Sequence, residues 1–285
     1  MVALGTAQTT LISGPTGPLE ILSKGTGPPS TLFVHGLGGT IASTRVFAGA
    51  TPGRRSFVHI AGHGASSPPP QMTYTALADE VRVAADYVDA DAALGVSMGA
   101  GAVCNLVAEE PQRFKAIVLV LPAALDTPRV SAPPVDRSTD GIPGHDPSLD
   151  NAAAQRFTRL ARLVEGADVE EVAAYLAGFE SQSGDAVMAW CRAQAAQLIA
   201  GHAQRALTQL PRQSPLADVE ALRAVSCPVL VIAQEGDQVH PVSVARRLGE
   251  VLPCSRVEVL PRGGIMWAHR DHVRALVGDF LCDAR

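Results

Sequence analysis

The 285-residue chain is 47% hydrophobic and 18% charged, which argues against intrinsic disorder and provides enough apolar side chains for a large buried core. Its formal net charge of −5 and its lack of Lys/Arg runs argue against nucleic acid as a partner. No apolar stretch approaches the roughly 18 to 20 residues that are needed to span a bilayer, so we expect no membrane segment.

The cysteines favour a reduced, cytoplasmic environment. They are odd in number and widely spaced, and no pair has the spacing of metal ligands. Residues 1–14 have neither a positively charged region nor a long apolar run, so they do not resemble a signal peptide. The five cysteines are Cys104, Cys191, Cys227, Cys254 and Cys282.

Short apolar runs alternate with amphipathic stretches, which is the pattern of βαβ units. The α/β fold class follows: a doubly wound, mostly parallel sheet with helices on both faces. Residues 9–12 and 19–23 predict a leading hairpin. Further strands are predicted over 31–34, 56–60, 91–96, 116–121, 228–233 and 256–260, and helices over 75–88, 100–109, 242–251 and 272–281.

The middle of the chain differs from this alternation. Residues 126–147 are rich in proline and polar side chains, and residues 151 to about 209 are helical in pattern with no strand-like run. We therefore expect a core made of residues 1–125 and 216–285, with a helical lid inserted at 126–215.

A nucleophile elbow is predicted at Gly95-Val96-Ser97-Met98-Gly99. In this pattern a serine occupies a sharp turn between a strand and a helix, and the small flanking residues let the turn close. The motif follows an apolar strand and opens a helical pattern, which favours Ser97 as a nucleophile over an incidental serine in a glycine-rich loop.

A second glycine-rich motif, residues 35–39, follows the strand predicted over 31–34. Acyl-transfer enzymes of this architecture build half of their oxyanion hole at this place. We expect the backbone N–H groups of Leu37 and Met98 to form the hole, with Gly36 and Gly38 allowing a close approach of the backbone. The alternative is a flexible turn.

With these motifs the chain resembles the α/β-hydrolase superfamily, and within it the small lid-bearing serine esterases. The resemblance covers nearly the whole chain outside the insertion and includes two further motifs, GHGAS at 62–66 and GDQVHP at 236–241. It implies that Asp237 is the acid of a catalytic triad, against the alternative of an aspartate in a solvent-exposed turn. His35 and His63 are expected to brace their turns rather than to do chemistry.

The base of the triad departs from the family pattern, because Ile265 stands where the family commonly has its histidine after the last strand. We favour His269, four residues further along the same loop, because a base needs only to reach the serine hydroxyl and an orienting acid. His272, or a histidine from elsewhere such as His240, is a second possibility. A third is that the base has been lost.

No cofactor or metal is expected, because the sequence lacks G-x-G-x-x-G, the P-loop motif, H-E-x-x-H and any Cys/His cluster. A serine at the elbow also argues against haloalkane dehalogenases and epoxide hydrolases, which need a carboxylate there. Apolar lid residues, together with Met98, Met266 and Trp267, predict an apolar pocket above Ser97.

The sequence therefore predicts an enzyme that hydrolyses a carboxylic ester, lactone or thioester of a small, largely apolar substrate through an acyl-enzyme. The alternative is a non-hydrolytic relative that binds a ligand or guides a rearrangement after losing the base. The sequence leaves the oligomeric state open.

Overall fold

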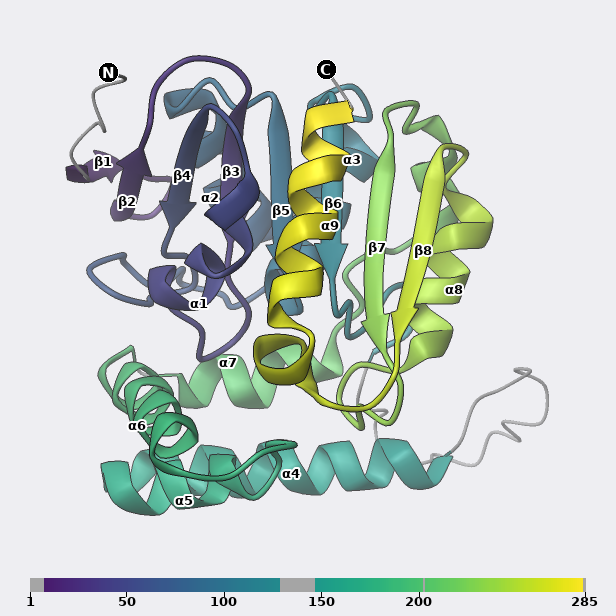
Figure 1. The fold of residues 1–285 in the computed structure, drawn as a ribbon. Helices are drawn as coiled ribbons and strands as arrows, with labels where there is room; N and C mark the ends of the chain where they lie inside the picture. Colours follow the sequence, from purple (N-terminus) through teal and green to yellow (C-terminus); the bar gives the residue numbers. More distant parts are fainter. Residues whose placement is uncertain (1–7, 129–146, 202, 284–285) are drawn as a thin grey trace.

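Eight strands form a single sheet in the computed structural model, which describes residues 8–128, 147–201 and 203–283 (Figure 1). The first two strands are antiparallel to their neighbours, and all other pairs are parallel, as the sequence predicts. The sheet order is β1-β2-β4-β3-β5-β6-β7-β8. The strands are β1 (Gln8–Ser13), β2 (Pro18–Lys24), β3 (Ser30–Val34), β4 (Arg54–Val58), β5 (Ala92–Val96), β6 (Ala116–Val120), β7 (Val229–Gln234) and β8 (Ser255–Leu260).

The central strands are apolar along their whole length because both faces of the sheet are covered. Every residue of β3 and of β6 is buried. Side chains alternate between the two faces, so Leu32 belongs to the cluster on one side of the sheet and Phe33 to the cluster on the other.

Helices cover both faces. The C-terminal helix α9 packs on the face in front in Figure 1, where Val273 and Val277 join the cluster of Phe33, and α2, α3 and α8 cover the opposite face. None of the helices in the described ranges is long and apolar enough to cross a membrane. The helices of the core are α1 (Ile41–Arg45), α2 (Tyr74–Tyr87), α3 (Met98–Glu109), α8 (Val242–Val251) and α9 (Arg270–Asp283).

The predicted strands and core helices are confirmed, with ends that differ by a few residues. The largest strand difference is at β4, which starts and ends two residues before the predicted 56–60. The N–H of Ile60 does not continue the parallel ladder, because it donates to Nε2 of His35 at 3.1 Å. A side chain from the neighbouring strand end thus replaces the sheet partner.

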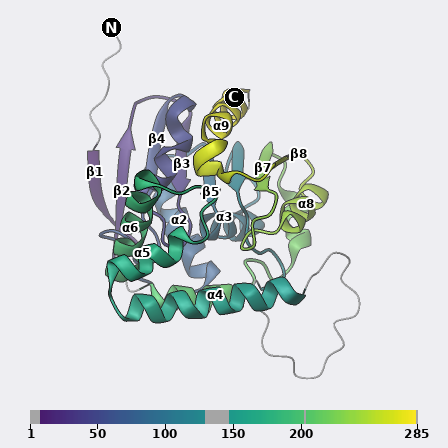
Figure 2. The same ribbon diagram turned by 60° about the horizontal axis from the view of Figure 1, so that its bottom comes forward.

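The helices between β6 and β7 lie across the carboxyl ends of the strands (Figures 1 and 2). They pack on one another through their own apolar cluster, which Leu37 and Trp267 of the core also contact. Residues 129–146 of the predicted proline-rich segment lie outside the described residues, and the domain division at 126 and 215 stays a prediction. The helices are α4 (Pro147–Glu165), α5 (Val169–Ala177), α6 (Asp185–Ala200) and α7 (Gln204–Gln209).

The site is positioned by the order of the central strands. β3 lies between β4 and β5, so the chain leaves β3 toward one edge of the sheet and later returns to add β5 and β6 on the other side. Loops that follow strands on the two sides of such a switch point diverge and leave a crevice at the carboxyl edge. The motif at 35–39 and the elbow at 95–99 follow these two adjacent strands.

Replacing Leu94 with alanine should destabilise the fold by about 2–5 kcal/mol, because this fully buried side chain on β5 would leave a cavity in the core. Urea unfolding followed by circular dichroism measures the change. Leu11→Ala is the matched control, since Leu11 is 58% exposed on the edge strand β1 and should change stability by no more than about 0.5 kcal/mol. Equal losses in both variants would contradict this account of the core.

Candidate active site

Ser97 forms the turn between β5 and α3 with a strained backbone. Its φ of 50° and ψ of −109° lie in a region that L-residues rarely adopt, at a cost on the order of 1–3 kcal/mol. A Cβ atom on Gly95 would lie 2.5 Å from the carbonyl oxygen of Gly99, and one on Gly99 would lie 2.6 Å from that of Val34. Both flanking positions therefore require glycine, which is the physical content of the elbow motif.

His240 lies beside this serine. Its Nε2 is 2.9 Å from Ser97 Oγ, and its Nδ1 is 2.8 Å from Oδ2 of Asp237. An ionised carboxylate can only accept hydrogen bonds, so Nδ1 carries the ring proton and Nε2 is left to accept the serine hydroxyl. The three side chains form one hydrogen-bonded chain at the carboxyl edge of the sheet.

The acid and the imidazole of this chain belong to the same short loop after β7. Oδ1 of Asp237 accepts the backbone N–H of Val239 at 2.9 Å and that of His240 at 3.0 Å, which folds the loop back over the carboxylate. Burial by itself would raise the pKa of Asp237, but His240 and the two N–H donors outweigh it and lower the pKa below its ordinary value. The carboxylate is therefore ionised at neutral pH.

His269, the expected base, is turned away from this arrangement. Its Nε2 is hydrogen bonded to the carbonyl oxygen of Pro261 at 3.0 Å, so the ring closes its own loop. Gly263 and Gly264, with φ of 148° and 83°, lead the chain into a π-helical turn, Gly264–Ala268, which buries Ile265. The position beside Ser97 that we expected His269 to fill is held by His240.

The second expected alternative contained both His272 and His240, and the structure separates them. His272 is exposed in the first turn of α9. A signal for His240 was present in the sequence, because it follows the carboxyl end of β7, in the loop of Asp237. In an open α/β sheet the groups that meet a ligand come from such strand ends, whereas His269 sits behind two glycines whose path the sequence does not determine.

The loop that is expected to contribute to an oxyanion hole lies against Ser97. A Cβ atom on Gly36 would lie 3.2 Å from Cβ of Ser97, so the loop after β3 passes directly against the elbow. The backbone N–H groups of Leu37 and Met98 have no hydrogen-bond acceptor among the described residues. Their use by a reacting oxygen stays a prediction.

Three buried histidines fix this loop. Nε2 of His63 accepts the N–H of Gly38 at 3.0 Å, and Nε2 of His59 accepts that of Ile41 at 3.0 Å. His35, which is completely buried beside them, accepts the N–H of Ile60. The bracing role expected for His35 and His63 is confirmed, and His59 shares it, with its Nδ1 bonded to a carboxylate oxygen of Glu20.

These bonds need neutral rings. Burial lowers the pKa of His63 to about 4, and burial together with the neighbouring His63 and His59 lowers that of His35 well below its ordinary value. A proton on Nε2 would replace an acceptor with a donor that faces a backbone N–H.

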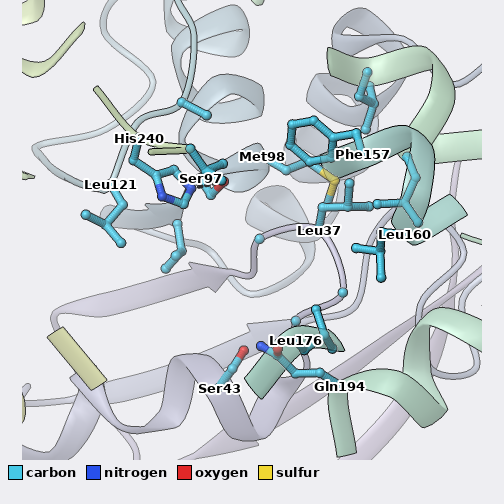
Figure 3. A pocket seen from close by; sticks show the side chains of 18 of the residues that line it. Leu37, Ser43, Ser97, Met98, Leu121, Phe157, Leu160, Leu176, Gln194 and His240 are labelled. Carbon is cyan, nitrogen blue, oxygen red and sulfur yellow. Dashed lines mark hydrogen bonds between the residues drawn. The ribbon is translucent and has the colours of Figure 1, made fainter. Parts of the chain in front are cut away.

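A cavity of about 260 Å³ opens above Ser97 (Figure 3). Ser97 and His240 lie on one side of it, and Phe157 and Leu160 of α4 lie on the other, with Met98 between them. The expected pocket residues Gly36, Leu37, Gly38, Met98 and Met266 all line it, and most of the lining is apolar.

Trp267 does not line this cavity, contrary to our expectation. Its indole N–H donates to Oε2 of Glu180 at 2.8 Å, and its ring packs edge-on against Trp190. Trp267 therefore joins the loop after β8 to the helices between β6 and β7. Within the described part of the chain, no cluster of three or more His, Cys, Asp or Glu side chains could hold a metal ion.

The sequence matches the family model of the alpha/beta hydrolase fold over residues 29–266, so the chain belongs to this family. A search of the curated proteins found no significant match.

Solved structures of the same fold align over nearly the whole chain. An esterase from Exiguobacterium antarcticum gives a TM-score of 0.74 at 16% identity, covering 96% of this chain and 100% of the esterase. Carboxylesterase CesB from Bacillus subtilis gives 0.71 at 19% identity, covering 98% and 93%. A meta-cleavage product hydrolase from Pseudomonas fluorescens IP01 gives 0.71 at 18% identity, covering 99% of each. At these identities the likeness establishes the fold.

Replacing His63 with glutamine should flatten the pH dependence of stability. Between about pH 6.5 and 4 the unfolded chain binds a proton at His63 that the folded chain does not, so the wild type loses stability as the pH falls. Between pH 7 and 5 the wild type should lose about 2 kcal/mol more than His63→Gln, whose amide oxygen can still accept the N–H of Gly38. Urea unfolding at each pH measures the difference.

The control for that experiment is His272→Gln, at an exposed histidine of α9, which should keep the pH profile of the wild type. Parallel profiles for the wild type and His63→Gln would show that the imidazole of His63 is not held neutral by burial.

Proposed function

We propose that this protein is a serine hydrolase that cleaves a small carboxylic ester, or a related lactone or thioester, through an acyl-enzyme. The observation that carries the proposal is the hydrogen-bonded chain from Ser97 Oγ through His240 to Asp237. A serine whose hydroxyl faces the free nitrogen of an imidazole, with a carboxylate on the other nitrogen, has the arrangement that activates a nucleophile.

In the first half-reaction, Ser97 Oγ attacks the carbonyl carbon of the ester while Nε2 of His240 takes the hydroxyl proton. The tetrahedral intermediate carries its negative charge on the former carbonyl oxygen, where the N–H groups of Leu37 and Met98 would stabilise it. When the intermediate collapses, the bond to the alcohol oxygen breaks, and His240 returns the proton to that oxygen. The alcohol leaves, and the acyl group stays on Ser97.

In the second half-reaction, a water molecule takes the place of the serine. His240 accepts one proton of the water as its oxygen attacks the acyl-enzyme, and the proton then passes to Ser97 Oγ as the bond to the acyl carbon breaks. The products are a carboxylic acid and free enzyme. Asp237 stays ionised throughout, holds Nδ1 protonated and stabilises the imidazolium that forms in each half-reaction.

The cavity supports a substrate of small size. Its volume of about 260 Å³ is below the usual range of roughly 300–1,000 Å³ for ligand sites. Two of the similar solved structures are an esterase and a carboxylesterase, which supports ester hydrolysis. The non-hydrolytic alternative depended on a missing base. Since His240 offers an imidazole in contact with Ser97, the contact argues against that alternative.

Removing the imidazole of His240 should abolish turnover, whereas His269, in the loop after β8, should be dispensable. We expect His240→Ala and Ser97→Ala to lower kcat on p-nitrophenyl acetate and butyrate by at least about 10³-fold. His269→Ala should keep kcat within about threefold of the wild type, because its ring bonds only backbone carbonyl groups.

The same substrates measure all three variants, and a fluorophosphonate probe reports whether Ser97 is a reactive nucleophile. If His240→Ala retains activity and His269→Ala loses it, the assignment of the base is wrong. If the wild type neither turns over these esters nor reacts with the probe, the proposed function is wrong.

Asp237→Asn should lower kcat by about 10⁴-fold with little change in KM. The amide can still accept the two backbone N–H groups at Oδ1, but its NH₂ group faces Nδ1 and favours the opposite ring tautomer, which puts a proton on Nε2. Steady-state kinetics on p-nitrophenyl butyrate tests this, with urea unfolding to show that the loop is intact. A loss of less than tenfold would exclude Asp237 as the orienting acid.

A further inference from the structure

The apolar cavity above Ser97 contains a positive charge that the proposed chemistry does not use. In the part of the chain that the structure describes, Arg156 of α4 is the only Lys or Arg among the residues lining the cavity. It comes from the lid helices and shares the cavity with Ser97 and His240, which lie at the end of the sheet.

The side chain of Arg156 is held by an aromatic ring, and no counter-ion for it is found among the described residues. Its guanidinium lies over the ring of Phe179, 3.7 Å from the centroid, and its backbone carbonyl accepts the hydroxyl of Tyr175 at 3.3 Å. No carboxylate among the described residues lies within ion-pair distance of its nitrogens. Stacking on an aromatic face leaves the N–H groups in the guanidinium plane available to an acceptor.

The two carboxylates whose charges act on Arg156 already have partners of their own. Glu180 accepts the indole N–H of Trp267. Asp237 accepts the Nδ1–H of His240 and two backbone N–H groups. Burial lowers the pKa of Arg156 from its ordinary value, and the charges of Asp237 and Glu180 partly offset that shift. Arginine stays protonated under any such shift at neutral pH, so the cavity holds a cation whose guanidinium N–H groups have no acceptor among the described residues.

We propose that Arg156 binds a carboxylate of the substrate, so that the protein prefers small esters that carry a second, free carboxylate, such as hemiesters of dicarboxylic acids. This inference rests on the proposed function and adds the substrate class to it. A planar carboxylate matches the fork of the guanidinium and forms two charge-assisted hydrogen bonds. A singly charged group fits better than a phosphate dianion, because the carboxylate of Glu180 also lines the cavity and the charge of Asp237 acts on Arg156 as well.

The test compares charged and neutral substrates of equal length. Monomethyl succinate, glutarate and adipate are assayed by proton release against the methyl esters of the unbranched monocarboxylic acids of the same length. The wild type is compared with Arg156→Met, which keeps the length and apolar stem of the side chain, and with Arg156→Lys, which keeps the charge but not the fork.

The wild type should show its highest kcat/KM on one of the hemiesters. Arg156→Met should lower that kcat/KM by about 10- to 100-fold, mainly through KM, and leave the neutral esters within about threefold. Arg156→Lys should restore part of the loss. Arg159→Met is the matched control: this arginine lies one turn further along α4, is exposed, contacts the ring of Tyr175 and does not line the cavity, so its kinetics should be those of the wild type.

The inference is overturned if Arg156→Met changes kcat/KM for charged and neutral esters by the same factor. Such a result would mean that Arg156 affects only the fold or the position of His240, and not the binding of a carboxylate. It is also overturned if the wild type does not prefer any hemiester over its neutral counterpart. Calorimetry with Ser97→Ala, which cannot form an acyl-enzyme, separates this failure from that of the proposed function. Monomethyl adipate should bind Ser97→Ala at least tenfold more tightly than the double variant with Arg156→Met, whether or not the wild type hydrolyses esters.

Discussion

The candidate site depends on one carboxylate that has two structural tasks. Oδ1 of Asp237 closes the turn after β7 by accepting two backbone N–H groups. Oδ2 accepts the Nδ1–H of His240, three residues later in the chain. The turn and the imidazole orientation are therefore fixed by the same group, and no contribution from the loop after β8 is needed. That loop instead carries Ile265, which packs into the core, and Trp267, which contacts the helices between β6 and β7.

On the other side of Ser97, the loop after β3 is held by imidazoles instead of by a regular ladder. A backbone that must leave its N–H groups free for a ligand cannot satisfy them in a helix or a sheet, and the remaining ones need other partners when they are buried. His63 and His59 accept the N–H groups of Gly38 and Ile41, while the N–H of Leu37 stays unpaired among the described residues. The arrangement positions the proposed oxyanion donors, and it requires that the buried rings stay neutral.

The helices between β6 and β7 complete the cavity and contribute its one arginine among the described residues. The sheet contributes Ser97 and His240, whereas Arg156 comes from α4, far from both in the sequence. Under the proposed function, the reacting groups and the groups that select the substrate thus belong to different parts of the chain. This agrees with the general observation that a fold of this class keeps its chemistry at the strand ends and varies what covers them.

The sequence by itself determined the strands, the core helices and the elbow at Ser97, because each depends on local patterns: apolar runs, helical spacing and glycines that the turn requires. The resemblance of residues 236–241 to the acid loop of the family implied Asp237, and the expected cavity residues beside the elbow were correct except for Trp267. Only the tertiary structure decided which histidine meets Ser97, since a short Asx turn brings His240 back over the sheet and two glycines with positive φ turn His269 away. The sequence likewise left the position of Arg156 undetermined, because the packing of α4 across the sheet edge is set by contacts between segments that are distant in the sequence.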